Sequence, residues 1–387
     1  MRIVDIRELP VPISRYADPS VPSGGLTTSV VAVITDVNRD GKPIVGYGFA
    51  SIGRFAQGGL IRKRFAPRLL AARDIDLMDN AGTNLDPFRA WKVMMSGEKP
   101  GGHGERCVAV GALDMALWDA TAKIAQLPLY RLLADRTAGT EVTSPPVYAG
   151  GGYYYPTDDV GRFSDEVRRF SDLGYRRAKI KIGGAPLAQD LKRIDAAARL
   201  LDGPDHLAVD AIYAYTPTSS IEAADLLAPL GLWWFEDICD SLDFETLAAV
   251  ARCYTAPIAT GEALFSAAET NLLDRHGGLR RDRDILLFDP VHCYGLPGYL
   301  QIVEVLEKRG WPRAAFWPHG GHLFCLHVVA ALGLGGAEVN PLCFQPFGGY
   351  GDNEIISEGV ATPSQIPGIG FEARQDLRDL LATLLDG

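Results

Sequence analysis

Cysteine is scarce in this chain, and the few cysteines are not arranged for bonding or metal binding. Six occur among 387 residues, without CxxC pairs or close spacing. This spacing argues against a disulfide framework and a zinc motif, and it favours a reduced, cytoplasmic setting. The first residues, MRIVDIRELPVPIS, carry charges inside their apolar stretch and predict a strand in place of a signal peptide.

Long hydrophobic runs and an excess of positive charge are also missing. No apolar run approaches the roughly 18 residues of a membrane span. The net charge of −10 disfavours binding to nucleic acid or to an anionic membrane. A small anionic substrate would therefore need locally placed cations or a metal ion.

The order of the expected elements predicts an α/β protein with two parts. Residues 1–140 combine three strand-like runs with helical stretches, which indicates an α+β capping domain. Val108, Ala112, Met115, Trp118 and Ala122 recur at helical spacing and predict one buried helix face. Residues 141–350 alternate strands with amphipathic helices, and 351–387 form a tail expected to return to the capping domain. Strands are expected at 145–150, 176–182, 206–210, 231–235, 256–260, 284–288, 313–317 and 340–345.

Polar residues recur after these expected strands at intervals between 26 and 30 residues. They are Lys181, Asp210, Glu236, Glu262, Asp289, His319 and Gln345. One strand, one helix and two loops need about that length, so a barrel would bring all seven to one rim. Catalytic groups of such barrels lie at that rim.

Asp210, Glu236 and Glu262 would come from three consecutive strands. Three carboxylates on neighbouring strand ends suit Mg²⁺, and without a cation they would repel one another. The competing interpretation is that they cap the following helices or form surface ion pairs.

Two lysines and a histidine–aspartate pair would flank these acids. Lys179 and Lys181 alternate along one strand and would face the same side. A lysine beside another cation loses proton affinity and can act as a base, although most KxK sequences are only exposed strand ends. Asp289 could orient His319 and raise its pKa, which would make it a proton donor. His322 is the rival histidine.

This constellation resembles the enolase superfamily, mandelate racemase subgroup, over essentially the whole chain. The lysine motif, the three acids, the Asp289–His319 pair and the helix string GALDMALWDATAKI at 111–124 carry the resemblance. It implies a (β/α)7β barrel, a TIM-like barrel with a capping domain, with Mg²⁺ held by Asp210, Glu236 and Glu262.

The resemblance also implies dehydration of an acid sugar, a tartrate-like hydroxy diacid, to a 2-keto acid. Lys181 would remove the α-proton, His319 held by Asp289 would protonate the departing hydroxyl, and Lys179 would bind the carboxylate and lower the pKa of Lys181. Lys99, Gln345 and His322 are the candidates for further substrate contacts. Homo-oligomers are usual for such proteins.

Two other functions fit the same residues. A racemase or epimerase could exchange a proton between Lys181 and His319, and a non-catalytic homologue could bind an acid as a sensor. Ile212 and Ala263 stand where relatives often have Asn beside metal ligands. These departures bear on the substrate more than on the class of chemistry.

Overall fold

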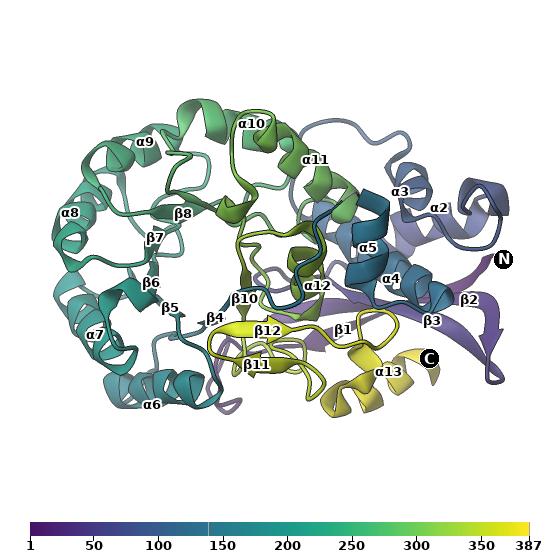
Figure 1. Cartoon of the computed structure of the whole chain (residues 1–387), viewed down its shortest axis with the longest axis horizontal. Helices are drawn as coiled ribbons and strands as arrows, with labels where there is room; N and C mark the ends of the chain where they lie inside the picture. Colours follow the sequence, from purple (N-terminus) through teal and green to yellow (C-terminus); the bar gives the residue numbers. More distant parts are fainter. Residues whose placement is uncertain (138, 387) are drawn as a thin grey trace.

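The computed structural model describes residues 1–137 and 139–386. It consists of a curled parallel sheet ringed by helices and a separate antiparallel sheet with its own helices (Figure 1). This is the α/β barrel with an α+β capping part that the sequence predicts.

The capping part begins with a three-stranded antiparallel sheet in the order β1–β2–β3. Its strands are β1 (Ile3–Pro12), β2 (Thr27–Arg39) and β3 (Lys42–Phe49). Asp40 and Gly41 join β2 to β3, and both have positive φ values, 53° and 77°. Two consecutive positive φ values match the right-handed twist of a hairpin, which explains the Asp-Gly pair.

Helices cover one face of this sheet, and the longest of them, α4, is buried on all sides. The helical elements are α1 (Gly58–Leu60), the π-helix η1 (Ile61–Phe65), α2 (Ala66–Ala71), η2 (Asp74–Asp76), α3 (Pro87–Met95), α4 (Glu105–Ala125) and α5 (Leu129–Thr137). The sequence predicts a single buried face for α4, yet every residue from Cys107 to Ala122 is buried. The helix packs on β3 along one side and touches α11 of the barrel part along another.

Among the described residues, no helix has both the length and the apolar character needed to cross a membrane.

The barrel part is a seven-stranded parallel sheet in the order β10–β4–β5–β6–β7–β8–β9. The strands are β4 (Val147–Gly150), β5 (Ala178–Lys181), β6 (Leu207–Asp210), β7 (Trp234–Glu236), β8 (Ile258–Thr260), β9 (Ile285–Leu286) and β10 (Ala337–Val339). Around them lie α6 (Asp159–Asp172), α7 (Leu187–Leu200), η3 (Pro204–His206), α8 (Pro217–Leu227), η4 (Ala228–Leu230), α9 (Phe244–Cys253), α10 (Ala267–His276), α11 (Leu296–Glu307), η5 (Arg313–Ala315) and α12 (Leu323–Leu332). Figure 1 shows the helices on the outside of the curled sheet.

An extended segment, residues 316–319, fills the place between β9 and β10. The Trp317 N–H donates to the Leu286 carbonyl at 2.9 Å, and the His319 N–H donates to that of Leu287 at 3.2 Å. On the other side, the Gly335 N–H donates to the Phe316 carbonyl at 3.0 Å. The segment therefore takes the seventh strand position, although the expected strand at 313–317 begins as the short helix η5.

The prediction of the eighth strand at 340–345 is wrong. Strand β10 occupies Ala337–Val339 and pairs with β4, with Glu338 opposite Tyr148. Helix α12 ends at Leu332 with Gly333 in a left-handed conformation, φ 62°, so the chain reverses early and the strand follows at once. Gln345 consequently lies in a loop beyond the strand, preceding a cis peptide bond to Pro346.

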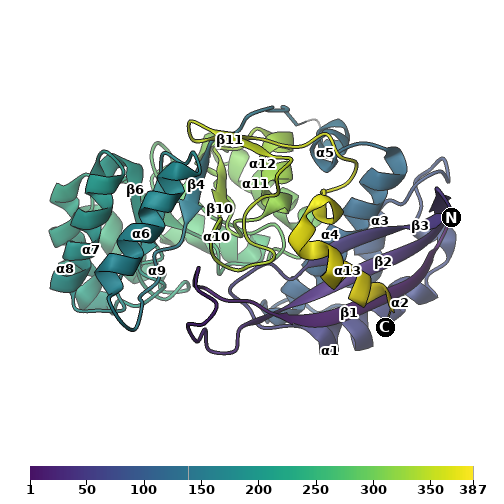
Figure 2. The same ribbon diagram turned by 90° about the horizontal axis from the view of Figure 1, so that it is seen from below.

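The C-terminal residues run back from the barrel to the antiparallel sheet. They form a small hairpin of β11 (Ile355–Ser357) and β12 (Val360–Thr362), then η6 (Phe371–Ala373) and α13 (Gln375–Asp386). Helix α13 contacts β1 and β2, and Figure 2 shows it against this sheet. No strand pattern in residues 351–387 predicts this hairpin. The domain boundaries at 140 and 350 remain a proposal.

A buried histidine, His327 on α12, connects α12 to α5 and to the C-terminal tail through hydrogen bonds. Its burial is also expected to make the free energy of unfolding depend on pH. Its Nδ1 accepts from the Tyr130 N–H at 3.1 Å, and its Nε2 pairs with the Ile369 carbonyl at 3.0 Å. The neutral ring satisfies both partners. Burial lowers the pKa of His327 from 6.5 to about 4, despite the favourable Ile369 carbonyl.

We expect the free energy of unfolding to fall by up to about 3 kcal/mol from this group between pH 6.5 and pH 4. The unfolded chain binds a proton at His327 across this window, whereas the folded chain does not. Urea unfolding of wild type and His327→Gln between pH 7 and pH 4.5 measures the difference, because other groups titrate in both proteins. Parallel pH profiles would contradict this assignment.

Candidate active site

Neighbouring strands end in register and bring the expected lysines and acids together. Lys181 on β5 lies directly opposite Asp210 on β6, and Asp210 lies opposite Glu236 on β7. Parallel strands end at one rim, so this register places the three side chains side by side.

Three buried carboxylates form a compact group here, and one of them was not expected. Oxygen atoms of Asp210, Glu236 and Asp237 all lie within 4.8 Å of one another. Asp237 has a left-handed backbone conformation, φ 45°. Its Oδ1 accepts from the Thr260 hydroxyl at 3.0 Å, and its buried Oδ2 has no hydrogen-bond partner. The only sequence signal for Asp237 is its place next to Glu236, after the strand.

Glu262 approaches the site from the next strand position. It follows β8 after Gly261, and it lines the same cavity as Asp210 and Lys181. Its Oε2 lies 3.4 Å from His319 Nε2, so in this arrangement it faces the histidine. Its role as the third metal ligand stays a prediction.

The two lysines are buried and paired with the acids. Lys179 Nζ contacts Glu236, and it lies 3.5 Å from Asp210 and 3.1 Å from Glu338. Lys181 Nζ pairs with Asp210. Burial is the largest single effect and acts to lower the pKa of Lys181, but Asp210, Tyr153 and Glu236 together outweigh it and raise that pKa above its ordinary value. Repulsion from Lys179 acts in the expected lowering direction, but in this arrangement it is the smaller effect.

The expected histidine–aspartate pair is formed. Asp289 Oδ2 lies 2.9 Å from His319 Nδ1 and also accepts from the Ser51 hydroxyl at 2.7 Å. Asp289 Oδ1 accepts from the Val291 N–H at 2.7 Å. Burial acts to lower the pKa of His319, but Glu262 and Asp289 outweigh it and raise that pKa to about 9. His319 is therefore protonated near neutral pH, as a proton donor requires.

Helix α4 holds the segment after Asp289 in place. A Cβ atom at Gly111 would lie 1.8 Å from the Val291 carbonyl oxygen, so only glycine allows this approach. Asp114, one turn later, accepts from the Leu296 N–H at 2.7 Å. The helix signature 111–124 thus includes two residues that pack against the loop carrying the Asp289 pair.

These residues surround a cavity of about 330 Å³ at the rim of the barrel. Its walls also include residues from the N-terminal loops. The lining residues are Arg15, Leu26, Ile52, Gly53, Arg54, Tyr153, Lys181, Asp210, Ile212, Tyr213, Glu262, His292, His319 and Phe344. Lys181 and His319 stand on different walls, because β5 and segment 316–319 are separated by β4 and β10 around the barrel.

The three candidates for further substrate contacts lie outside this lining. Lys99 lines a neighbouring cavity of about 320 Å³. Gln345 is exposed, and its amide donates to the Gly348 carbonyl at 3.3 Å. His322 is fully buried, with Nε2 3.1 Å from the Ser51 hydroxyl. Gln345 is displaced because the eighth strand ends earlier than expected.

Glu338 on β10 takes the eighth strand position that Gln345 was expected to hold. Its carboxylate lies 3.1 Å from Lys179 Nζ and accepts from the Gly320 N–H at 3.2 Å. It thereby links the lysine pair to the loop that carries His319. The alternation of Glu338 with the apolar Ala337 and Val339 was the signal for it.

The donor set suits a hard divalent cation. Asp210, Glu236 and Asp237 supply carboxylate oxygens, and Glu262 faces the same cavity. The buried Asp237 Oδ2 has no hydrogen-bond partner among the residues that the structure describes, and a cation or an ordered ligand would supply one. Oxygen ligands of this kind are those that Mg²⁺ prefers.

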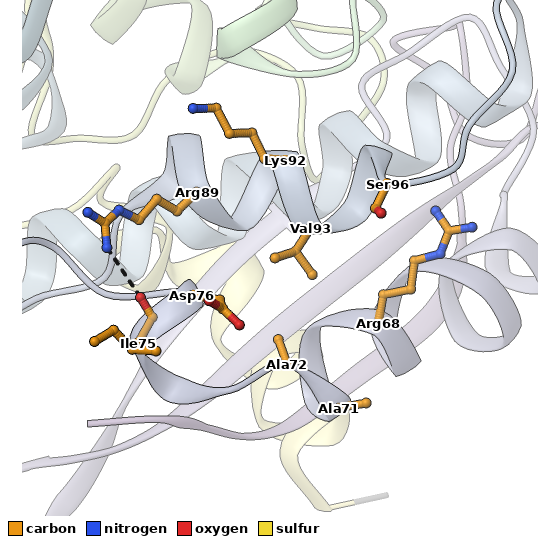
Figure 3. A pocket seen from close by; sticks show the side chains of 9 residues that line it. All are labelled: Arg68, Ala71, Ala72, Ile75, Asp76, Arg89, Lys92, Val93 and Ser96. Atoms are coloured by element: carbon orange, nitrogen blue, oxygen red, sulfur yellow. Dashed lines mark hydrogen bonds between the residues drawn. The ribbon is translucent and has the colours of Figure 1, made fainter.

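A wider hollow on the capping part has different chemistry. It lies between α2, η2 and α3, and Arg68, Asp76, Arg89 and Lys92 are among its lining residues (Figure 3). Arg89 donates to the Ile75 carbonyl at 3.2 Å, and Arg68 pairs with Glu98 at 2.9 Å. Its arginines are thus engaged in holding the capping helices together.

Fold and site together define a barrel protein whose acids, lysines and histidine meet at the carboxyl ends of its strands. Residues 162–377 match the family described as Enolase C-terminal domain-like. Residues 25–134 match the mandelate racemase / muconate lactonizing enzyme N-terminal domain. The chain belongs to the enolase superfamily, in the mandelate racemase / muconate lactonizing enzyme group.

Several characterised relatives resemble the chain. Arabinonate dehydratase of Saccharolobus solfataricus is 29% identical over 234 residues, and the match spans 60% of each chain, less than two thirds of that relative's length. L-talarate/galactarate dehydratase of Salmonella typhimurium is 29% identical over 312 residues, 79% of this chain and 72% of the relative. The crystal structure of L-talarate dehydratase from Polaromonas sp. JS666, complexed with Mg and L-glucarate, superposes with a TM-score of 0.72 at 25% identity. That superposition covers 95% of this chain and 94% of the other.

Proposed function

We propose that this protein is a Mg²⁺-dependent dehydratase of acid sugars. The observation that carries the proposal is that Lys181 and His319 stand on different walls of one cavity whose rim holds Asp210 and Glu262. The relatives named as arabinonate and L-talarate/galactarate dehydratases support this class of reaction.

Asp210, Glu236 and Glu262 would hold the Mg²⁺, with Asp237 beside them. Mg²⁺ bound there supplies positive charge that makes a proton next to a carboxylate easier to remove. Lys179 places a second cation in the same carboxylate group, where it can bind the acid end of the substrate.

Lys181 would take the α-proton. It can do so when Asp210 no longer pairs with it, because the repulsion from Lys179 then favours the neutral amine. His319 would give its proton to the departing β-hydroxyl, so the C–O bond breaks and water leaves. The resulting enol becomes a 2-keto acid. Asp289 keeps the His319 ring oriented through the 2.9 Å contact at Nδ1.

The finer proposal is that the substrate is D-tartrate or a similar hydroxy diacid. It rests on the resemblance of several strings to D-tartrate dehydratase, among them GRFAQGGLIRKRF at 53–65, AGGGYYYP at 149–156 and PHGGH at 318–322. Arg54 and Tyr153, which both line the cavity, fall in these strings.

A racemase or epimerase is the second candidate. Lys181 and His319 on different walls could exchange a proton at one carbon without loss of water. A protein that only binds an acid remains the third, and it would show no turnover of any kind.

We expect a panel of mono- and diacid sugars with Mg²⁺ to yield a 2-keto acid that semicarbazide traps. Chelation with EDTA should abolish the signal, and added Mg²⁺ should restore it, because the carboxylates alone cannot neutralise the developing charge. An epimerase would instead exchange the α-proton with D₂O and release no keto acid. Turnover that EDTA leaves unchanged would contradict the metal-dependent mechanism.

A further inference from the structure

One histidine in the cavity wall, His292, has a ring without hydrogen-bond partners in the described part of the chain. His292 is 2% exposed, lines the cavity, and neither ring nitrogen has a hydrogen-bond partner among the described residues. Its Nδ1 lies 3.7 Å from Asp289 Oδ2, too far for a hydrogen bond. Leaving two buried nitrogens unpaired is costly, so a bound molecule in the cavity is their natural partner.

Arg54 lies near His292, because both side chains pack against the ring of Phe265. The Arg54 guanidinium carbon is 4.7 Å from the centre of the Phe265 ring, and the His292 ring meets Phe265 at 5.2 Å, edge to face. Arg54 lines the cavity and has no carboxylate partner among residues 1–137 and 139–386. A guanidinium without a counter-charge is suited to a carboxylate, which it can bind through two parallel hydrogen bonds.

We propose that Arg54 and His292, both packed on Phe265, form a subsite for a second carboxylate of the substrate, so that the substrate is a diacid. This inference rests on the proposed function and names the substrate class. The His292 and His319 rings are 5.5 Å apart, and in the proposed reaction His319 would protonate the departing hydroxyl. In a four-carbon diacid the carbon that loses this hydroxyl also carries the distal carboxylate. The distal group therefore falls on the His319 side of the cavity, where Arg54 and His292 lie.

Two other cationic side chains, those of Lys99 and Arg15, lie away from this subsite. Lys99 and Phe265 both line the neighbouring cavity, and Lys99 is not among the residues that line the active-site cavity. Arg15 lies on the opposite side, 5.7 Å from the Tyr153 ring, which Lys181 also contacts at 5.1 Å. Arg15 is thus close to the proton-abstracting end, away from His319.

The test compares diacids with monoacids of equal length. Tartrate against the four-carbon aldonic acids, and galactarate against galactonate, differ only at the distal carbon. We expect Arg54→Met to lower kcat/KM for the diacids by roughly 100-fold, since a buried polar group loses its partner. The loss of kcat/KM for the monoacids should stay within about threefold. His292→Leu should also lower kcat/KM selectively for the diacids, but by a smaller factor than Arg54→Met. Arg54→Lys should recover part of the loss, and Arg252→Met, a change at an exposed arginine on α9, is the matched control that keeps wild-type selectivity.

Binding provides a readout that does not need turnover. Calorimetric titration of Mg²⁺-loaded Lys181→Met with tartrate, with and without Arg54→Met, should show the same selective loss. The inference is overturned if Arg54→Met weakens the binding of diacids and monoacids equally, or if it weakens the binding of neither. A wild-type protein that prefers monoacids would also overturn it. In each case the proposed dehydration of acid sugars still stands. If no acid is dehydrated but the selective loss of tartrate binding persists, the subsite stands and the proposed reaction fails.

Discussion

Replacing Lys181 by Met is expected to lower kcat by about 10⁴-fold, the upper range for loss of a general base. Methionine keeps much of the side-chain volume beside Tyr153 and removes the amine that would accept the α-proton. Both keto-acid formation and exchange of the α-proton with D₂O should disappear together, because both begin with the same proton transfer. Steady-state turnover measures keto-acid formation, and NMR in D₂O measures exchange of the α-proton.

The matched control for this change is Lys192→Met, since Lys192 is exposed on α7 and does not line the cavity. We expect it to retain wild-type kcat. Removing Lys181 also leaves Asp210 without its ion-pair partner, so retained Mg²⁺ binding must be checked by calorimetry. A Lys181→Met protein that binds Mg²⁺, yet keeps exchanging the α-proton at the wild-type rate, would exclude Lys181 as the base.

Replacing His319 by Asn is expected to separate the two halves of the reaction. Dehydration should fall by about 10³-fold because the departing hydroxyl loses its proton donor. Exchange of the α-proton in D₂O should persist, because Lys181 is still present on the other wall. Glu262 and Asp289 raise the pKa of His319, which favours the donor form near neutral pH in wild type.

His276→Asn is the control, because His276 is an exposed residue at the end of α10. If His319→Asn abolished exchange as completely as dehydration, His319 would be needed before the hydroxyl leaves. That result would favour the racemase or epimerase, in which either residue can move the α-proton. Equal activity of His319→Asn and wild type would remove His319 from the mechanism.

Much of the fold could be predicted because each strand–helix repeat leaves a local pattern. The apolar runs before Lys181, Asp210 and Glu236 are strands within a few residues of the predicted bounds. The eighth strand was misplaced because two apolar runs, LGLGGAEV and NPLCFQP, compete for one position, and each could form a strand. Pairing with β4 selects the first of them, and that pairing is a tertiary contact between residues 190 positions apart.

The active site likewise contains residues that the sequence predicted and residues that only the tertiary structure revealed. Lys179, Lys181, Asp210, Glu236, Asp289 and His319 meet as expected, because strand ends at one rim converge regardless of loop detail. Lys99 could not be placed, since the reach of its glycine-rich loop depends on how the capping part docks. Ser51 and Arg54 were missed for the same reason, because their proximity to His319 arises only from that docking. His292 lies in the barrel part, three residues after Asp289, and nothing in its local sequence indicated that it lines the cavity.

Cytoplasmic location and homo-oligomer formation stay predictions, and neither is needed for the site described above. The sequence by itself determined the barrel, its carboxylate rim and the lysine and histidine on either side, because spacing along the chain sets which residues end each strand. Only the tertiary structure decided which residues close the cavity. Those residues come from loops whose direction depends on packing, as where Gly111 admits the Val291 carbonyl and Phe265 supports both Arg54 and His292.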